Sequence, residues 1–553
     1  MPDAGAGLLG IGALLLLLAL AHVPLGNHLA RVYTSDRHLG AERLVYRIAR
    51  VDPRADQRWT AYALSLLAFS AVSALLLYAL LRLQGVLPLA QGHDGMHPSG
   101  AFNTAVAFVS NTDWQWYAGE NTLGPLVQMA GLAVQNVLSA AVGLSVAVAL
   151  IRGFTRSRTD RLGNFWVDLV RGTVRVLLPL AVLAAVVLAA CGVVQNFHAA
   201  REITTLGGGA QTLTGGPVAS QEAVKLLGSN GGGYYGANSA HPYENPTPFS
   251  NFFQIFLLLL IPSALPRAFG KMTGSPRHGL AVLAAMGVLW AAGLAAVTAA
   301  EAAHGGQVPQ VVGAATEGKE WRFGVWDSAL FAASTTGTST GATDARHDSF
   351  TPLGGGALLA AMLLGEVAPG GVGSGLYGML VLAMLAVFLA GLMVGRTPEY
   401  LGKKLRPKEI TLLALYVLVM PVTVLAGTGL ALGFPEPRAT LLAGPPHGLS
   451  EVLYAFASAA NNNGSAFAGL GADTVFWQTG LGLAMLIGRY LPMVLVLGLA
   501  GSLAGQQHTP SGTGTLPAHT PLFTGLLVTV TVVVAGLTFF PVLALGPLAE
   551  GLR

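Results

Sequence analysis

The chain has 553 residues, of which 53% are hydrophobic and only 10% are charged. A soluble domain averages about 25% charged residues, so this composition excludes a soluble enzyme, a secreted scaffold and a disordered protein. The formal net charge of +4 is not gathered on any long polar segment that could bind nucleic acid. The single cysteine, Cys191, excludes a disulfide framework.

Ten apolar stretches are long enough to cross a bilayer as helices. They cover approximately 6–28, 60–83, 123–150, 173–194, 250–268, 279–300, 375–395, 410–432, 475–501 and 521–547. No basic residue precedes the first stretch, and Asp3 is acidic, so we expect a retained span rather than a cleaved signal peptide. The sequence therefore predicts an all-α polytopic membrane protein.

The connections between these spans alternate in character. One set is rich in Lys and Arg and holds most of the 30 basic residues, at 31–58, 152–175, 267–277 and 396–408. The positive-inside rule assigns this set to the cytoplasm, so we expect both termini on the outside. The other set is longer and is rich in Gly, Asn, Ser and Thr.

The outer connections repeat one pattern, in which a stretch too short to span precedes a polar cluster and a return to the membrane. The short stretches cover 98–109, 218–227, 325–336 and 449–459. We interpret them as re-entrant pore helices of four membrane–pore–membrane repeats around one axis. The expected parts are a first helix with a cytoplasmic loop (1–58), four pore repeats (59–165, 166–278, 279–409 and 410–505), and a cytoplasmic loop with the last helix (506–553).

Polar, Gly-rich backbone at membrane depth must be buried in protein or line a cavity. Glycine lets such a loop turn its carbonyl oxygens inward, and four such loops can replace the hydration shell of a monovalent cation. The C-terminal ends of the four short helices would add partial negative charge. The alternative is four ordinary surface loops, but the string GSNGGGYYGANSAHPYENP at 228–246 is not one that helix packing requires.

These stretches resemble the potassium-binding, channel-like subunit of the Kdp-type potassium-transporting ATPase. The resemblance extends from the first span to the last and implies the superfamily of K+ transporters that includes Trk, Ktr and HKT proteins. The matching segments are SNTDWQ at 110–115, GSNGGGYYGANSAHPYENPTPFSN at 228–251, HDSFTPLGG at 347–355, GEVAPGGVGSGLYG at 365–378, GRTPEYLGKK at 395–404 and SAANNNGSAFAGL at 458–470.

The resemblance implies a K+ filter built from three residues of each loop, with Gln115 behind the first loop. The implied filter residues are Asn111, Thr112 and Asp113, then Ser229, Asn230 and Gly231, then Ser339, Thr340 and Gly341, and finally Asn462, Asn463 and Gly464. Asp113 and Asp344 stand where the family usually has Asn, and Thr340 stands where it often has Cys. A carboxylate at Asp113 would strengthen cation attraction but weaken discrimination between cations.

Two charged residues are candidates for control of the ion path. Arg489 lies inside the ninth span, where a charge must face a cavity or a partner. We interpret it as a positive charge below the filter that hinders straight passage of K+, with a side chain that reaches the cytoplasmic surface as the alternative. Glu366 is the expected counter-charge, in the stretch 365–378 that interrupts a span and resembles the family's gating loop.

Two further groups of residues do not indicate additional sites. His241 and His347 match no closed ligand set with the nearby carboxylates, so no structural metal is expected. The basic residues Lys403, Lys404 and Arg406 suit a solvated cytoplasmic face, which in the family lies against the catalytic subunit. The sequence has no phosphate-binding loop and no DKTG phosphorylation motif, so we expect no ATP site on this chain and ATP hydrolysis by a partner.

The resemblance thus implies the ion-selecting subunit of an ATP-driven K+ uptake complex in a bacterial plasma membrane. The implied partners are a P-type ATPase catalytic subunit, a single-span periplasmic subunit and a small hydrophobic peptide. One alternative is a stand-alone K+ channel or transporter of the Trk/Ktr kind. Another is an intramembrane enzyme, for which the spans offer no nucleophile–base or metal pair.

Overall fold

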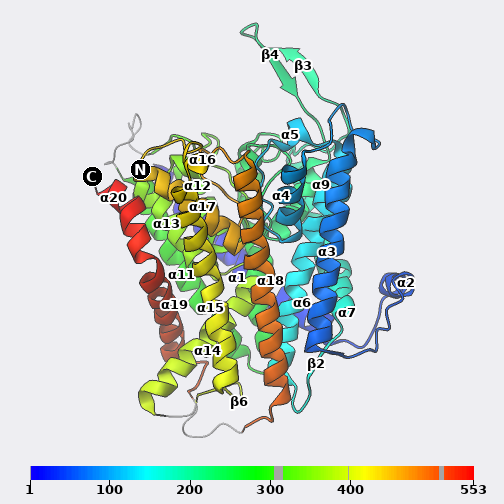
Figure 1. Ribbon diagram of the computed structural model, residues 1–553, viewed down its shortest axis with the longest axis vertical. Helices are drawn as coiled ribbons and strands as arrows, with labels where there is room; N and C mark the ends of the chain where they lie inside the picture. Colours follow the sequence, from blue (N-terminus) through cyan, green and yellow to red (C-terminus); the bar gives the residue numbers. More distant parts are fainter. Residues whose placement is uncertain (1, 304–314, 396–397, 510–515, 553) are drawn as a thin grey trace.

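The computed structural model describes residues 2–303, 315–395, 398–509 and 516–552. Long helices stand side by side in a bundle, and both termini lie at the end that carries the β3–β4 hairpin (Figure 1). Arg396, which the sequence places in the last basic connection, lies outside the described residues.

Ten helical segments in the described ranges are long and apolar enough to cross a membrane, as the sequence predicts. Most are single helices, whereas the third, fourth and tenth contain the π-helical segments η2 (Val127–Ala133), η3 (Gly172–Leu177) and η6 (Ala544–Leu548). The long helices are α1 (Pro2–Thr34), α3 (Trp59–Leu83), α6 (Val134–Thr155), α7 (Phe165–Arg171) with α8 (Leu178–Ala190), α10 (Pro248–Met272), α11 (Pro276–Ala302), α14 (Ser374–Val394), α15 (Pro407–Gly433), α18 (Val475–Gly505) and α19 (Pro521–Leu543).

Four short helices lie among these spans and match the predicted pore helices. They are α4 (Pro98–Val109), α9 (Val218–Leu227), α12 (Gly324–Gly337) and α17 (His447–Asn461). Each packs against at least one span next to it in the chain: α4 against α3 and α6, α9 against α8 and α10, α12 against α11, and α17 against α15 and α18. The membrane–pore–membrane arrangement is therefore present four times.

The span that follows α12 is broken. Helix α13 (Pro352–Leu363) ends early, and α14 starts only at Ser374. The connection 364–373 contains Gly365, Gly370 and Gly373 in the left-handed region, which stops both helices from joining. The interruption predicted at 365–378 thus places irregular backbone inside the bundle.

The remaining elements are short and connect the helices at the two ends of the bundle. The helical ones are α2 (Gly40–Ile48), η1 (Gln84–Val86), α5 (Gly119–Thr122), η4 (Asn238–Ala240), η5 (His347–Ser349), α16 (Pro435–Arg438), η6 (Ala544–Leu548) and α20 (Ala549–Gly551). Three antiparallel pairs complete the described ranges: β1 (Gln57–Arg58) with β2 (Arg161–Gly163), β3 (Arg201–Thr204) with β4 (Ala210–Leu213), and β5 (Glu399–Tyr400) with β6 (Lys403–Lys404).

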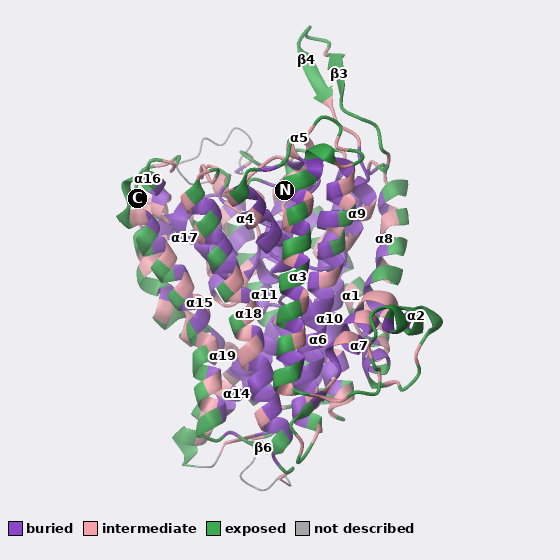
Figure 2. Cartoon of the chain, turned by 45° about the vertical axis from the view of Figure 1, so that its right-hand side comes forward, coloured by how far each residue is buried: buried purple, intermediate pink, exposed green. Residues whose placement is uncertain are grey.

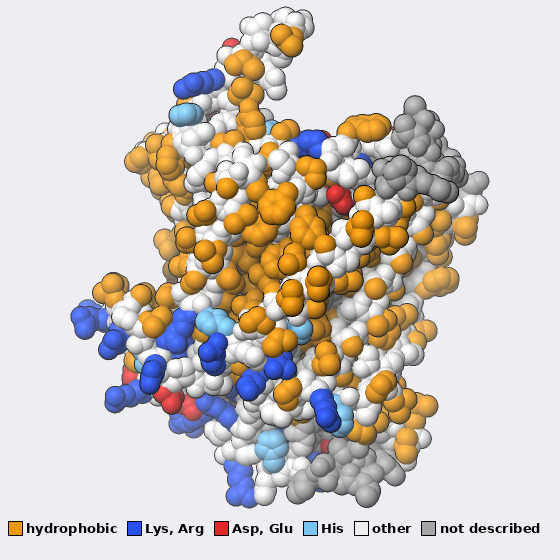
Figure 3. Space-filling model, turned by 180° about the vertical axis from the view of Figure 1, so that it is seen from behind, with side chains coloured by type: hydrophobic (Ala, Val, Ile, Leu, Met, Phe, Trp, Pro, Cys, Tyr) orange, Lys and Arg blue, Asp and Glu red, His pale blue; other side chains and the backbone are white. Residues whose placement is uncertain are grey.

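Burial distinguishes a central helix from peripheral ones. In the span Val127–Thr155, 89% of the most apolar window is buried, compared with 11% in Ala4–Thr34 (Figure 2). The outer helices instead expose Leu, Val and Phe side chains, which suits contact with lipid. Apolar side chains cover the middle of the surface, while Lys and Arg gather toward the end opposite the hairpin (Figure 3).

Candidate functional site

The four pore helices end in the same way. The residue one or two positions beyond each helix adopts a left-handed backbone, with φ of 69° at Asn111, 51° at Ser229, 55° at Ser339 and 59° at Asn462. This conformation is uncommon for residues other than Gly, although Asn tolerates it. Its recurrence shows that all four loops reverse direction through a left-handed residue at the inner end of the pore helix.

The loops meet at a common centre, and two glycines make the approach possible. A Cβ atom at Gly231 would lie 2.6 Å from the carbonyl oxygen of Thr112 and 2.8 Å from that of Asn463. A Cβ at Gly464, where φ is +107°, would overlap the Thr112 oxygen. Backbone from the first, second and fourth loops is therefore in contact. The third loop joins them because Gly341 packs against the carbonyl of Asn463.

This centre is rich in backbone oxygen, and its side chains are buried. Thr112, Asn230, Thr340 and Asn463 are all fully buried. The C-terminal ends of α4, α9, α12 and α17 point at the loops and contribute partial negative charge there. The arrangement can coordinate a dehydrated monovalent cation through carbonyl groups.

The first two loops are braced by the central helix α6. Asn136 donates through Nδ2 to Oδ2 of Asp113 at 2.6 Å, and its own carbonyl accepts from Asn230 Nδ2 at 3.0 Å. The hydroxyl of Ser139 lies 2.8 Å from Asn111 Oδ1 and 3.3 Å from Asn230 Oδ1. Neither Asn136 nor Ser139 is among the predicted site residues; their one signal in the sequence is polarity inside an otherwise apolar span.

The carboxylate of Asp113 points toward α6, where Asn136 binds it, so the side chain lies behind its own loop. The Asp113 backbone carbonyl instead faces the second loop, since a Cβ at Gly232 would lie 2.7 Å from it. Gln115 accepts a hydrogen bond from the Gly233 amide through Oε1 at 2.9 Å. Gln115 therefore ties the first loop to the second through this hydrogen bond.

The third and fourth loops are tied to each other and to the first. Ser339 Oγ donates to the carbonyl of Asn461 at 2.8 Å, and Asn462 Nδ2 donates to Thr112 Oγ1 at 2.9 Å. Asn463 Nδ2 donates to Glu366 Oε1 at 2.8 Å. The Asn463 side chain is thus directed at the broken span, while its carbonyl faces the centre.

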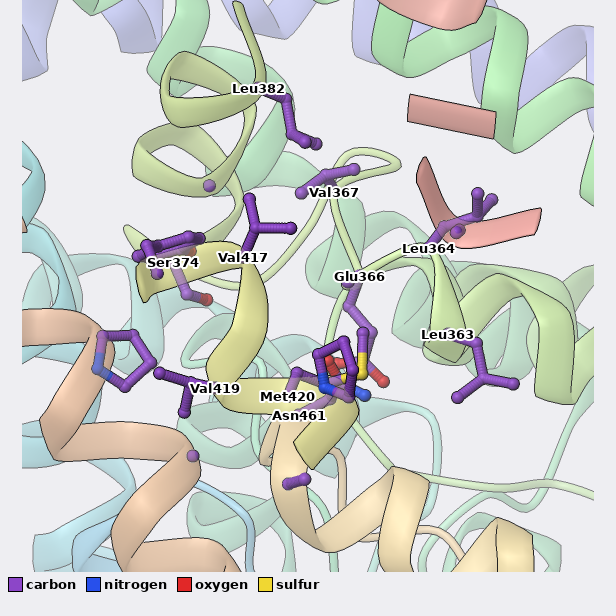
Figure 4. Close-up of a pocket in the computed structure, with 18 of the residues that line it drawn as sticks. Leu363, Leu364, Glu366, Val367, Ser374, Leu382, Val417, Val419, Met420 and Asn461 are labelled. Carbon is purple, nitrogen blue, oxygen red and sulfur yellow. The ribbon is translucent and has the colours of Figure 1, made fainter. Parts of the chain in front are cut away.

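A cavity lies on each side of the loops. The outer one, of about 460 Å³, is lined by Gln115, Gly232, Gly341 and Gly464 among others. The inner one, of about 110 Å³, is lined by Ser339, Glu366, Asn462 and Arg489 together with apolar side chains of α15 and α19. In Figure 4, Glu366 and Asn461 lie close together beside Met420, with Val367 and Leu364 continuing the wall.

Arg489 and Glu366 line the same inner cavity but do not form the expected ion pair. Arg489, only 4% exposed, donates through Nη2 to the Ser139 carbonyl at 3.0 Å, whereas Glu366 accepts from Asn463. In the described part of the chain no acidic side chain lies within ion-pair distance of Arg489. A backbone carbonyl on the facing helix takes that place.

The broken span closes the inner side beneath the third loop. The amides of Ala368 and Gly370 donate to the carbonyl of Gly337, the last residue of α12, at 3.2 Å and 2.8 Å. The connection also packs closely on the α6 backbone, where a Cβ at Gly143 would overlap the Val372 carbonyl. Irregular backbone therefore lies directly below the loops.

A buried charge cluster supports the second loop and was not foreseen. Lys225 Nζ lies 2.6 Å from Glu222 and 3.7 Å from Glu244, with all three side chains buried. Lys225 also donates to Asn238 Oδ1 at 3.0 Å, and Asn238 in turn donates to the carbonyl of Gly232. The available signal was a Glu and a Lys three residues apart within the short apolar stretch 218–227.

His241 and His347 lie in different surroundings. His241 stacks on Tyr235 with ring centroids 3.8 Å apart, and His347 Nδ1 lies 2.8 Å from the Tyr454 hydroxyl. Asp344 is buried near the third loop. Lys403 is buried and donates to the carbonyls of Arg156 and Gln506, so it is not the solvated side chain that the sequence suggested.

Comparison with known proteins places these observations in context. The family described as potassium-transporting ATPase A subunit matches residues 12–552. A potassium-transporting ATPase potassium-binding subunit of Kineococcus radiotolerans is 63% identical over 552 residues, covering 100% of this chain and 99% of that protein. Proteins of the same name from Mycobacterium avium and Streptomyces coelicolor are 60% and 59% identical; the first alignment covers 100% of both chains and the second covers 99% of both.

A solved structure shares the fold. The crystal structure of the potassium transporter TrkH from Vibrio parahaemolyticus superimposes with a TM-score of 0.52, covering 87% of this chain and 96% of that chain. The sequence identity is 15%, so the likeness concerns the fold alone.

Proposed function

Because this chain belongs to the potassium-transporting ATPase A subunit family, we propose that it is the potassium-binding subunit of an ATP-driven K+ uptake complex. The observation that carries this function is the convergence of four loops, each with a left-handed turn after a pore helix, on one carbonyl-rich centre. Carbonyl dipoles held at a fixed spacing replace the hydration shell of K+ better than that of the smaller Na+.

The proposed filter consists of the predicted residues of the four loops. Their backbone oxygens coordinate the ion, while the side chains of Asn111, Asn230 and Asn463 brace the loops from behind. The carboxylate of Asp113 is held by Asn136, which supports a role for its backbone carbonyl rather than its side chain. The filter residues are Asn111, Thr112, Asp113, Ser229, Asn230, Gly231, Ser339, Thr340, Gly341, Asn462, Asn463 and Gly464.

The ion enters through the outer cavity and does not continue straight inward. The connection 364–373 lies below the third loop, and the positive charge of Arg489 faces the inner cavity. That cavity is walled by α15 and α19 and reaches Thr531 and Thr538 on α19. We assign it to a sideways route, along which K+ passes to a partner. Glu366 and Arg489 set the electrostatic conditions of this step.

The partner is a P-type ATPase subunit that hydrolyses ATP, since the sequence of this chain contains neither a phosphate-binding loop nor a DKTG phosphorylation motif. A single-span periplasmic subunit and a small hydrophobic peptide complete the complex. The protein resides in a bacterial plasma membrane with both termini outside. This orientation is supported by the gathering of Lys and Arg at the end opposite the termini.

The repeats divide the chain at 59–165, 166–278, 279–409 and 410–505, with 1–58 and 506–553 outside them. The packing of each pore helix against a span of its own repeat supports this division. A stand-alone channel of the Trk/Ktr kind would share the fold but would need no ATPase subunit. Co-purification with a phosphorylatable subunit separates the two functions.

The deciding experiment compares the wild-type complex, reconstituted in vesicles, with Gly231→Asp. The side chain would intrude on the carbonyls of Thr112 and Asn463. We expect the K+ concentration for half-maximal ATPase activity to rise by about 100-fold, equivalent to about 2.7 kcal/mol of lost ion binding, and K+/Rb+ discrimination to fall. Unchanged affinity and discrimination would refute the filter assignment.

A further inference from the structure

A cluster of metal-ligating side chains lies at the same end of the bundle as the chain termini, away from the ion path. It joins η5, which carries Asp348, to the start of α17, which carries His447 and Glu451. His447 and Glu451 are four residues apart, so they share one face of the helix. One potential ligand atom from each of the three residues lies within 4.8 Å of the other two.

The carboxylate of Glu451 is the observation that calls for a ligand. The residue is fully buried, and among the described residues no side-chain donor reaches its oxygens, which face the backbone of Leu442 and Ala443. A buried, unpaired carboxylate is costly, and such groups are normally paired or coordinate a metal. Gly469 leaves room beside it, because a Cβ there would lie 2.7 Å from Asp348 Oδ2 and 2.8 Å from Glu451 Oε1.

The imidazole of His447 is already held in the orientation that a metal ligand needs. Its Nδ1 lies 3.1 Å from the carboxylate of Glu550 on α20, and its Nε2 lies 3.0 Å from Asp348 Oδ1. The ring stacks on Phe467 at an interplanar angle of 8°. Glu550 holds the ring through Nδ1, and a metal bound between Nε2 and Asp348 Oδ1 would replace the hydrogen that these two atoms now share, with release of one proton to solvent.

The charges favour a divalent cation. Three carboxylates, those of Asp348, Glu451 and Glu550, surround His447, which gives up a proton when it binds a metal, and the half-exposed Arg346 lies 3.5 Å from Asp348 Oδ2. One imidazole nitrogen with carboxylate oxygens suits Zn²⁺ and related transition metals, whereas Ca²⁺ and Mg²⁺ prefer oxygen ligands alone. With zinc bonds of about 2.0–2.2 Å, ligand atoms lie roughly 3–4 Å apart, so the side chains, whose ligand atoms lie within 4.8 Å of one another, must draw together when the metal binds.

We propose that Asp348, His447 and Glu451 form a binding site for a divalent transition metal of the Zn²⁺ class, with Glu550 positioning His447. The metal links the loop of the third repeat, the pore helix of the fourth repeat and the C-terminal helix. It thereby anchors the outer end of α17, whose other end carries Asn462.

The test measures Zn²⁺ binding to the purified full-length chain in detergent, after treatment with a chelator. Metal content by mass spectrometry and competition with a chromophoric chelator give the stoichiometry and the affinity. We expect one Zn²⁺ per chain, with affinity at least about 100-fold lower in Glu451→Gln and His447→Gln and about 10–100-fold lower in Glu550→Gln. His198→Gln and Asp473→Asn, at exposed positions outside the cluster, are the matched controls and should bind like the wild type.

A thermal measurement guards against variants that lose binding because they misfold. Zn²⁺ should raise the melting temperature of the wild type and of both controls, because it binds the folded state. It should leave a folded Glu451→Gln chain unchanged. Equal Zn²⁺ binding by Glu451→Gln and the wild type, or binding of Ca²⁺ in preference to Zn²⁺, would overturn the proposal.

Discussion

The two cavities on either side of the four loops differ in size and in the residues that line them. The outer one is larger, at about 460 Å³, and is bordered by loop backbone, by Gln115 and by charged residues such as Lys319 and Glu320. The inner one, about 110 Å³, places Glu366 and Arg489 among apolar side chains. A charge in such apolar surroundings acts over a longer range than one near water. This difference suits the proposed division between ion selection by loop backbone and control of passage by the side chains of Glu366 and Arg489.

The largest effect is expected from a substitution in the loops that border the outer cavity. Gly464→Ala places a methyl group on the Thr112 carbonyl in a backbone conformation that disfavours a side chain. We expect K+-stimulated ATPase activity to fall by about 100-fold or more, the equivalent of about 3 kcal/mol. Gly480→Ala is the matched control, since nothing lies within 4 Å of a Cβ there. Comparable activity in the two variants would contradict the role of the glycine.

The next largest effect is expected from a substitution in the inner cavity. Arg489→Ala removes the positive charge from the inner cavity and leaves the loops in place, so K+ should leak through vesicles without ATP. We expect the ratio of K+ transported to ATP hydrolysed to change about tenfold, as for a barrier altered by about 1.4 kcal/mol. Arg489→Lys keeps the charge and should restore most of the coupling. Transport and leak equal to the wild type would contradict this role.

A smaller effect is expected at Ser139, which contacts both the outer loops and Arg489 of the inner cavity. Its hydroxyl lies beside Asn111 and Asn230, whereas its carbonyl accepts from Arg489. Ser139→Ala removes only the hydroxyl, which should weaken K+ affinity by about 2–10-fold, the value of one hydrogen bond. Ion leak should stay unchanged. Ser145→Ala on the same helix, whose hydroxyl bonds only within α6, serves as the control.

The smallest expected effect is a pH dependence at the outer rim. Burial and the nearby Arg322 lower the pKa of His241 to about 4, while Glu320 opposes this shift. The folded state therefore favours the neutral ring, whose Nδ1 accepts from the Tyr243 amide. The stabilisation is complete above the ordinary pKa of about 6.5 and is lost as the pH falls toward 4. The melting temperature should drop between pH 7 and pH 5, and drop less in His241→Gln.

Most of the fold could be predicted because membrane spans are recognisable in a sequence as long apolar stretches. The predicted stretches 98–109 and 218–227 coincide with α4 and α9. The left-handed residues lie one or two positions beyond each pore helix, within the predicted polar clusters. The break before α14 was visible as a run of glycines.

The contacts behind the loops could not be predicted, for three physical reasons. Asn136 and Ser139 are polar residues in a span, and sequence alone does not tell which way they face. The partner of Arg489 is a backbone carbonyl, which has no signature in the residue types. Asp348 and His447 are 99 positions apart and meet only through the fold.

The broken span also has a consequence for symmetry. A pore assembled from four identical chains repeats every feature four times. A segment that obstructs the ion path in one subunit is therefore present in all four subunits. A single chain with four unequal copies is free of this constraint. Within the described residues, the third copy is the one that replaces continuous helix by the connection 364–373. The four outer loops can therefore keep a nearly fourfold arrangement, while the inner side below them differs between the third repeat and the other three.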